Sequence, residues 1–175
     1  ALSYAFLGPL VGALSRAATG WVSDKYGGGR VTLWTFGCMI LAVYGVLHFL
    51  PDNGTGGSFV GFFACFMALF FLTGVGNAST FQMIPSIMKQ EVPRLMPNLD
   101  AGALQKQTEM ESAAIIAFTS AIAAYGAFFI PKLYGTSIAM TGAPNGALWA
   151  FLGFYAVCAV ICWIFYSRKS APVPC

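Results

Sequence analysis

Five long apolar segments, separated by short polar stretches, account for most of the 175 residues. They lie at 2–22, 31–50, 58–87, 111–131 and 147–167. Each is long enough to cross the roughly 30 Å hydrocarbon core of a bilayer as a helix. A helix satisfies its backbone hydrogen bonds within its own segment, which an open strand in lipid cannot do. The sequence therefore predicts an all-α membrane protein with five transmembrane helices.

The composition supports this class and argues against several others. Hydrophobic residues make up 58% of the chain and charged residues only 9%, whereas soluble domains carry about 25% charged residues. The basic residues are spread over loops and form no stripe that would bind nucleic acid. The cysteines lack the His or acidic neighbours of a metal site, and we find no nucleophile–base pair or phosphate-binding loop. We therefore expect no metal, no cofactor and no enzymatic activity.

The basic residues are unevenly divided between the two sides of the predicted bundle. If the sides alternate along the chain, Lys132 stands alone on one side. The other side holds seven basic residues, namely Lys25, Arg30, Lys89, Arg94, Lys106, Arg168 and Lys169. Loops rich in Lys and Arg face the cytoplasm, which places the N-terminus outside and the C-terminus inside. An odd number of helices that starts outside further predicts at least one preceding helix in a longer protein.

Three polar stretches are expected to connect the spans. The stretch 51–58 is predicted to form a short outer turn, since it is rich in Gly, Asn and Asp. The stretch 89–109 is predicted as a longer inner loop, and 132–146 as an outer loop. Pro85 removes a backbone donor, so we expect a kink in the third span near its cytoplasmic end.

Arg16 is a charged residue near the middle of an apolar segment. A charge at that depth costs roughly 2.5–3.5 kcal/mol on insertion scales. Gly8, Gly12, Arg16 and Gly20 recur every fourth residue, so they share one stripe of the helix. Small residues on that stripe let another helix approach closely. We therefore expect Arg16 to face protein or a cavity rather than lipid.

Two roles for Arg16 are compatible with this placement. It could tie helices together by bonding backbone carbonyls or a carboxylate, but the apolar spans offer it no acidic partner, because Glu109 and Glu111 lie at the cytoplasmic end of the fourth span. Alternatively, its planar guanidinium could bind a mobile anion, because this group suits flat oxyanions in a bidentate fashion. The absence of an acidic partner favours the second role, a substrate-binding cation in a translocation path.

Neutral polar residues also occur at membrane depth. Asn77 and Thr80 lie on the third span, and Ser120 lies on the fourth. They could form hydrogen bonds between helices, each worth about 0.6 kcal/mol on average, or they could contact an anion directly. Because the spans lack a clear titratable acid, the sequence favours anion exchange over proton-coupled symport.

Three segments carry a resemblance to a known family. The stretch GWVSDKYGGGR at 20–30 resembles the loop signature of the major facilitator superfamily, Gly-x-x-x-Asp-(Arg/Lys)-x-Gly followed by basic residues. Its matching positions are Gly20, Asp24, Lys25, Gly27 and Arg30. The stretches LTGVGNASTFQMIPSIMKQ at 72–90 and AFTSAIAAYGAFFIP at 117–131 extend the likeness. Together with SRAATGWVSDKYGGGRVT at 15–32, they resemble the C-terminal half of nitrate/nitrite porters of the NarK type.

The resemblance implies a specific fold and activity. Residues 1–175 would form part of a C-terminal six-helix bundle, with helices eight to twelve of a twelve-helix carrier. Such carriers lie in the inner (plasma) membrane and move nitrate and nitrite by alternating access. Besides these two anions, the partners of the chain would be the lipid bilayer and the N-terminal half of the same carrier. Exchange of these two anions is electroneutral.

The resemblance also implies roles for individual residues. Arg16 aligns with one of two arginines that grip nitrate in the family, and we add Asn77, Thr80 and Ser120 as substrate-binding candidates. The loop residues Gly20, Asp24, Lys25, Gly27 and Arg30 would take part in conformational change. Gly126 and Pro131 match a glycine-rich signature of the eleventh helix. That run departs from the family pattern at Ala117, Ala123 and Ala127, where glycine is usual.

Two other functions stay open on the sequence. The chain could belong to a carrier of another small or organic anion with the same fold. It could also be part of a membrane anion sensor that binds without transporting.

Overall fold

The computed structural model describes residues 4, 6–51, 56–168 and 171. Six α-helices and one π-helix follow one another, and no strand occurs among these residues. The elements are α1 (Leu7–Ala18), α2 (Gly20–Tyr26), α3 (Gly28–Phe49), α4 (Phe59–Leu95), α5 (Ala101–Thr141), α6 (Asn145–Cys162) and the π-helix η2 (Trp163–Ser167).

Four of the described helical stretches are long and apolar enough to cross a membrane. They are α3, α4, α5 and the continuous run Asn145–Ser167 formed by α6 and η2. The predicted class, an all-α membrane protein, is confirmed. The boundaries of the last four predicted spans shift, but each corresponds to one of these helices.

The first predicted span, 2–22, is not a continuous helix among the described residues. Helix α1 has 12 residues and ends at Ala18, and the seven-residue α2 begins at Gly20. At 1.5 Å per residue, α1 covers about 18 Å. Thr19 lies between the helices, and both its backbone N–H and its hydroxyl donate to the Ser15 carbonyl, at 3.0 and 2.6 Å. Residues 1–3 and 5, where the predicted span begins, lie outside the described residues.

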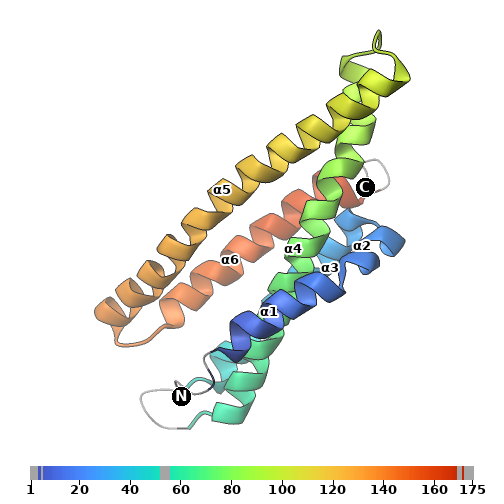
Figure 1. The fold of residues 1–175 in the computed structure, drawn as a ribbon. Coiled ribbons are helices and arrows are strands. Elements are labelled where there is room, and N and C mark those ends of the chain that lie inside the picture. The colour runs from blue at the N-terminus through green and yellow to red at the C-terminus, as the bar shows by residue number, and fades with distance from the viewer. Residues whose placement is uncertain (1–3, 5, 52–55, 169–170, 172–175) are drawn as a thin grey trace.

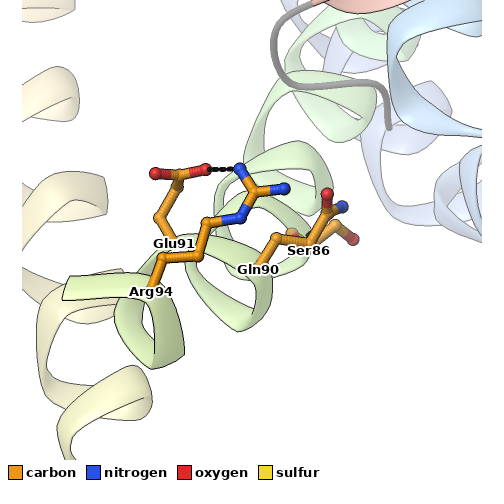
Figure 2. A network of polar contacts seen from close by, with 4 residues as sticks. All are labelled: Ser86, Gln90, Glu91 and Arg94. Carbon is orange, nitrogen blue, oxygen red and sulfur yellow. Dashed lines mark hydrogen bonds and ion pairs between the residues drawn. The ribbon is translucent and has the colours of Figure 1, made fainter. Parts of the chain in front are cut away.

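The predicted inner loop at 89–109 is wrong, because most of it is helical. Helix α4 continues to Leu95 and α5 begins at Ala101. Polar side chains along these turns bond within their own helix, as in the 2.7 Å ion pair between Arg94 and Glu91 (Figure 2). The polar residues of this stretch make it unsuited to lipid, but they do not end the helices. Gln, Lys, Glu and Leu, which are frequent here, all favour a helix.

The predicted outer loop at 132–146 is also mostly helical. Helix α5 runs to Thr141, and Gly142 ends it with a left-handed φ of +73°. Its N–H donates to the Ile138 carbonyl at 2.8 Å. A left-handed residue of this kind is a common helix end, and glycine adopts it without a steric penalty. The turn predicted at 51–58 contains residues 52–55, which lie outside the described residues.

Helices α3 and α4 form the centre of the bundle. The fully buried core joins Val43 and Val46 of α3 to Leu148 of α6, with Phe62 and Phe66 of α4 packed beside them. Helix α1 lies along α4, whereas α5 leans away from the other helices (Figure 1). Only one described residue of α5, Ser112, is buried.

The two ends of the bundle differ in charge. Helix α2, the start of α3, the α4–α5 turn and the end of η2 lie at one end (Figure 1). Basic residues on these parts are Lys25, Arg30, Arg94 and Arg168. The α5–α6 turn lies at the other end, nearer to Lys132. The structure thus has the alternation of sides on which the predicted topology depends. Lys169 lies outside the described residues.

Candidate functional site

The glycine stripe, formed by Gly8 and Gly12 of α1 and by Gly20 at the start of α2, faces α4. A methyl group placed on Gly8 would collide with the Phe70 ring, and one on Gly12 would lie 3.3 Å from the Phe70 carbonyl oxygen. One on Gly20 would lie 3.2 Å from the Gln82 side-chain nitrogen. The predicted close approach of another helix along this stripe is therefore present, and the neighbouring helix is α4.

Arg16 lies on the same stripe and contacts an aromatic ring of α4. Its guanidinium carbon is 4.9 Å from the centroid of the Phe81 ring, within the range of a cation–π interaction. The side chain is exposed. Among the described residues, the ion pair that occurs is Arg94–Glu91, and Arg16 has no carboxylate partner. Phe81 is a neighbour that sequence reasoning missed, because aromatic residues are frequent throughout the apolar spans.

Asn77 and Thr80 are three residues apart on α4, and Thr80 but not Asn77 lines a cavity. Asn77 is exposed and precedes Phe81 by four residues, so the two share the helix face that Arg16 contacts. Thr80 donates its hydroxyl to the Gly76 carbonyl of its own helix at 2.8 Å. This cavity lies between α3, α4, α5 and α6. By its spacing from Phe81, Asn77 shares a helix face with the ring that Arg16 contacts, while Thr80 lines the cavity.

Ser79, between these two residues, connects two helices. It is fully buried, and its hydroxyl lies 2.8 Å from that of Thr32 on α3. The Thr32 hydroxyl also lies 3.4 Å from the Met83 sulfur. Hydrogen bonding between helices, one of the two predicted uses of polar groups in this segment, is therefore present at Ser79.

Ser120 is not brought to the other substrate-binding candidates. It is exposed on α5, and its hydroxyl donates to the Ile116 carbonyl at 2.7 Å. Its neighbour Thr119, not Ser120, lines the cavity that Thr80 lines.

That cavity has a volume of about 460 Å³ and lies between α3, α4, α5 and α6. Its lining is mainly apolar, with hydroxyl-bearing side chains from Thr32, Thr80, Thr119 and Tyr166, and it includes no charged residue. Arg16 is not among its lining residues, so the cavity and the Arg16 site are separate. Within the described ranges, no three His, Cys, Asp or Glu side chains lie close enough to hold a metal ion.

The loop-signature residues lie where α2 meets α3 and α4. The Gln82 amide donates to the Asp24 carboxylate at 3.4 Å, so Asp24 contacts the side chain of α4 that also faces Gly20. Gly27 has a φ of +87° and separates α2 from α3. Lys25 lies over the Tyr26 ring at 5.4 Å, and Arg30 is exposed. The signature therefore joins three helices at the basic end of the bundle.

Gly126 and Pro131 lie on the outlying helix α5. A methyl group on Gly126 would be 3.8 Å from the Ile130 side chain, which is ordinary contact. Pro131 lies inside the helix, which continues past it to Thr141. Neither residue makes a close approach to another described helix.

Comparison with characterised proteins gives the chain its relatives, although no protein-family model matches it. It is 46% identical over 172 residues to the nitrate/nitrite transporter NarU of Salmonella typhimurium, and 44% identical to NarU of Escherichia coli. It is 35% identical over 175 residues to a probable nitrate/nitrite antiporter, NarK2, of Thermus thermophilus. These alignments cover 96–99% of the chain and 35–37% of the relatives. Over nearly its whole length, the chain is thus homologous to the NarU and NarK nitrate/nitrite transporters, of which it matches about one third of the length.

Proposed function

We propose that residues 1–175 are part of the C-terminal half of a major-facilitator carrier that exchanges nitrate and nitrite by alternating access. The observation that carries this proposal is the 46% identity over 172 residues to a nitrate/nitrite transporter. The long apolar helices α3, α4, α5 and α6 supply the membrane-spanning part. From the charge difference between the two ends of the bundle, the basic end faces the cytoplasm. The family resemblance implies that the carrier lies in the inner membrane.

Arg16 is the proposed anion ligand. Phe81 contacts the guanidinium through its ring, at 4.9 Å from the ring centroid, and the ring carries no negative charge that would cancel the cation. The N–H donors of the planar fork that do not face the ring can hold a planar oxyanion such as nitrate. No described carboxylate competes for them, since the ion pair in this part of the chain is Arg94–Glu91.

Neutral groups complete the proposed site. Asn77 lies on the face of α4 that Arg16 contacts, so its amide can donate to the same anion. Thr80 and Ser120 are further proposed ligands, on the sequence alone. In this structure their hydroxyls donate to carbonyl groups of their own helices, α4 and α5. A second arginine, implied by the family resemblance, would belong to another part of the carrier. Because nitrate and nitrite carry the same charge, their exchange moves no net charge.

Counterflow in proteoliposomes tests this proposal directly. Proteoliposomes that contain the full-length carrier would be loaded with nitrite, and nitrate would be added outside. Wild type would be compared with Arg16→Lys. Lysine keeps the positive charge but loses the planar fork, so we expect the variant to be inserted and folded but to exchange at a small fraction of the wild-type rate. Arg94→Lys is the matched control, because Arg94 is exposed and pairs only with Glu91 three residues away.

The outcomes separate the parts of the proposal. Normal exchange by Arg16→Lys would show that Arg16 has a structural role and that the site lies elsewhere. If wild type moves neither anion, the proposed substrates are wrong, and a panel of other small and organic anions would then distinguish another carrier from a sensor that binds without flux.

A further inference from the structure

Helices α1 and α4 approach each other closely beside the proposed anion site, at Gly74 of α4. A methyl group placed on Gly74 would collide with the Ser15 hydroxyl oxygen and the Gly12 carbonyl oxygen, and would lie 2.9 Å from the Arg16 backbone nitrogen. Two of these three atoms belong to backbone, which cannot rotate away as a side-chain tip can. Gly74 is buried, so α1 can lie this close to α4 only while position 74 has no side chain.

This contact determines where the Arg16 side chain begins. The Arg16 backbone nitrogen belongs to the crossing itself, and Ser15 beside it is buried and donates its hydroxyl to Gly12 at 3.0 Å. Phe81 follows Gly74 by seven residues on the same helix, which is about two turns or 10 Å. The guanidinium bridges this interval and reaches the Phe81 ring. A change in the α1–α4 distance at Gly74 therefore moves the guanidinium relative to Phe81 and Asn77.

We infer that Gly74 is a positioning residue for anion binding by Arg16. This inference rests on the proposed function, in which Arg16 is the substrate ligand. Gly74 does not touch the anion. Its role is to let α1 lie at the depth from which the guanidinium meets the face of α4 that carries Phe81 and Asn77. Misplacing a binding group by about 1 Å can cost up to a hundredfold in activity.

A purely structural role for Gly74 is the competing explanation, and the chain offers a matched control. Gly45 of α3 also allows close packing against α4, because a methyl group there would lie 2.7 Å from the Cys65 sulfur. Gly45 belongs to α3 and not to the α1–α4 contact. Gly45→Ala therefore perturbs helix packing without moving α1. Gly37→Ala is a second control, because nothing lies within 4 Å of the added methyl group.

The test uses the full-length carrier in detergent and in proteoliposomes. For each variant we would measure the melting temperature, the nitrate dissociation constant, and KM and kcat for counterflow. We expect Gly74→Ala to raise the nitrate dissociation constant and KM by about ten- to a hundredfold. Gly45→Ala should lower the melting temperature with an unchanged nitrate dissociation constant, and Gly37→Ala should change neither. Ser15→Gly added to Gly74→Ala removes one of the colliding atoms and should restore part of the affinity.

Equal nitrate affinity in Gly74→Ala and Gly45→Ala, at comparable loss of melting temperature, would overturn the inference. If Gly74→Ala is not inserted, Ser15→Thr takes its place, because it adds one methyl group to the same crossing from the α1 side; wild-type affinity in that variant would likewise overturn the inference. Failure of the proposed function is distinguishable, since wild type would then move neither anion, or Arg16→Lys would exchange normally, whatever Gly74→Ala does.

Discussion

At the scale of single residues, an aromatic ring rather than a carboxylate accompanies the conspicuous arginine. A carboxylate close to Arg16 would occupy its N–H donors and cancel its charge. The Phe81 ring contacts the guanidinium and carries no negative charge that would cancel it. This arrangement suits a site that must bind and release a monovalent anion, because the cation keeps its charge in the absence of substrate.

Replacing Phe81 tests this arrangement. Phe81→Leu keeps an apolar side chain but removes the ring, and a cation–π contact is worth about 0.5–2 kcal/mol. We expect KM for nitrate to rise by roughly two- to thirtyfold. Phe81→Trp retains a ring and should lie closer to wild type, and the comparison is made by initial rates of counterflow. Equal KM values in Phe81→Leu and wild type would contradict a role for the ring.

The buried hydroxyl pair between Thr32 and Ser79 is predicted to stabilise the α3–α4 contact. Ser79→Ala removes one member and leaves the buried Thr32 hydroxyl with the Met83 sulfur as its remaining side-chain partner. We expect a loss of about 1 kcal/mol in stability, measured by unfolding in detergent. Thr73→Ala is the control, because Thr73 is exposed and bonds only to the Phe70 carbonyl of its own helix. A similar loss in both variants would argue against the interhelical bond.

At the scale of elements, the sequence pattern predicted the wrong helix lengths. Apolar runs indicate how much of a helix can lie in lipid. Both long helices, however, include polar turns: α4 continues through them to Leu95, and α5 begins with them at Ala101. The opposite error occurred at the first span, where the composition is apolar but Thr19 interrupts the helix. Helices end where the backbone conformation or its hydrogen bonds change, and lipid solubility is a separate property.

The α2–α3 junction provides a test at this scale. Gly27 has a φ of +87° with ψ of 132°, a combination that residues with a Cβ rarely adopt. We expect Gly27→Ala to destabilise the folded carrier by about 1–3 kcal/mol, measured as a lower melting temperature. Gly37→Ala, with open space around its added methyl group, should change the melting temperature little. Equal effects would show that the junction relaxes without strain.

At the scale of the whole molecule, the described helices form a packed group with one outlying member. Helices α1, α3, α4 and α6 each contribute at least two buried residues to the packed group. Among the described residues of α5, only Ser112 is buried. The chain spans 35–37% of the length of the three relatives compared above. Under the proposed function, the remaining part of the carrier supplies the second arginine and the surfaces that α5 contacts.

The charge difference between the two ends predicts how the molecule lies in the membrane. In a cysteine-free background, Asn98→Cys lies in the turn between α4 and α5, and Thr141→Cys lies at the end of α5. We expect a membrane-impermeant maleimide added to intact spheroplasts to label position 141 and not position 98. Labelling after disruption of the membrane controls for the reactivity of both thiols, and the reverse pattern would overturn the proposed orientation.

The sequence by itself determined the class of the protein and the face of the helix that carries Arg16. Hydropathy identifies helices that suit lipid, and a spacing of four residues places Gly8, Gly12, Arg16 and Gly20 on one stripe, because both properties are local. The same local information supported the likeness to nitrate/nitrite transporters. Only the tertiary structure decided that Phe81 accompanies Arg16, that Gly74 meets Ser15, and that Ser120 lies apart. The two pairs that meet are each about 60 residues apart in the chain. Their meeting depends on how the helices cross, which periodicity within one helix does not specify.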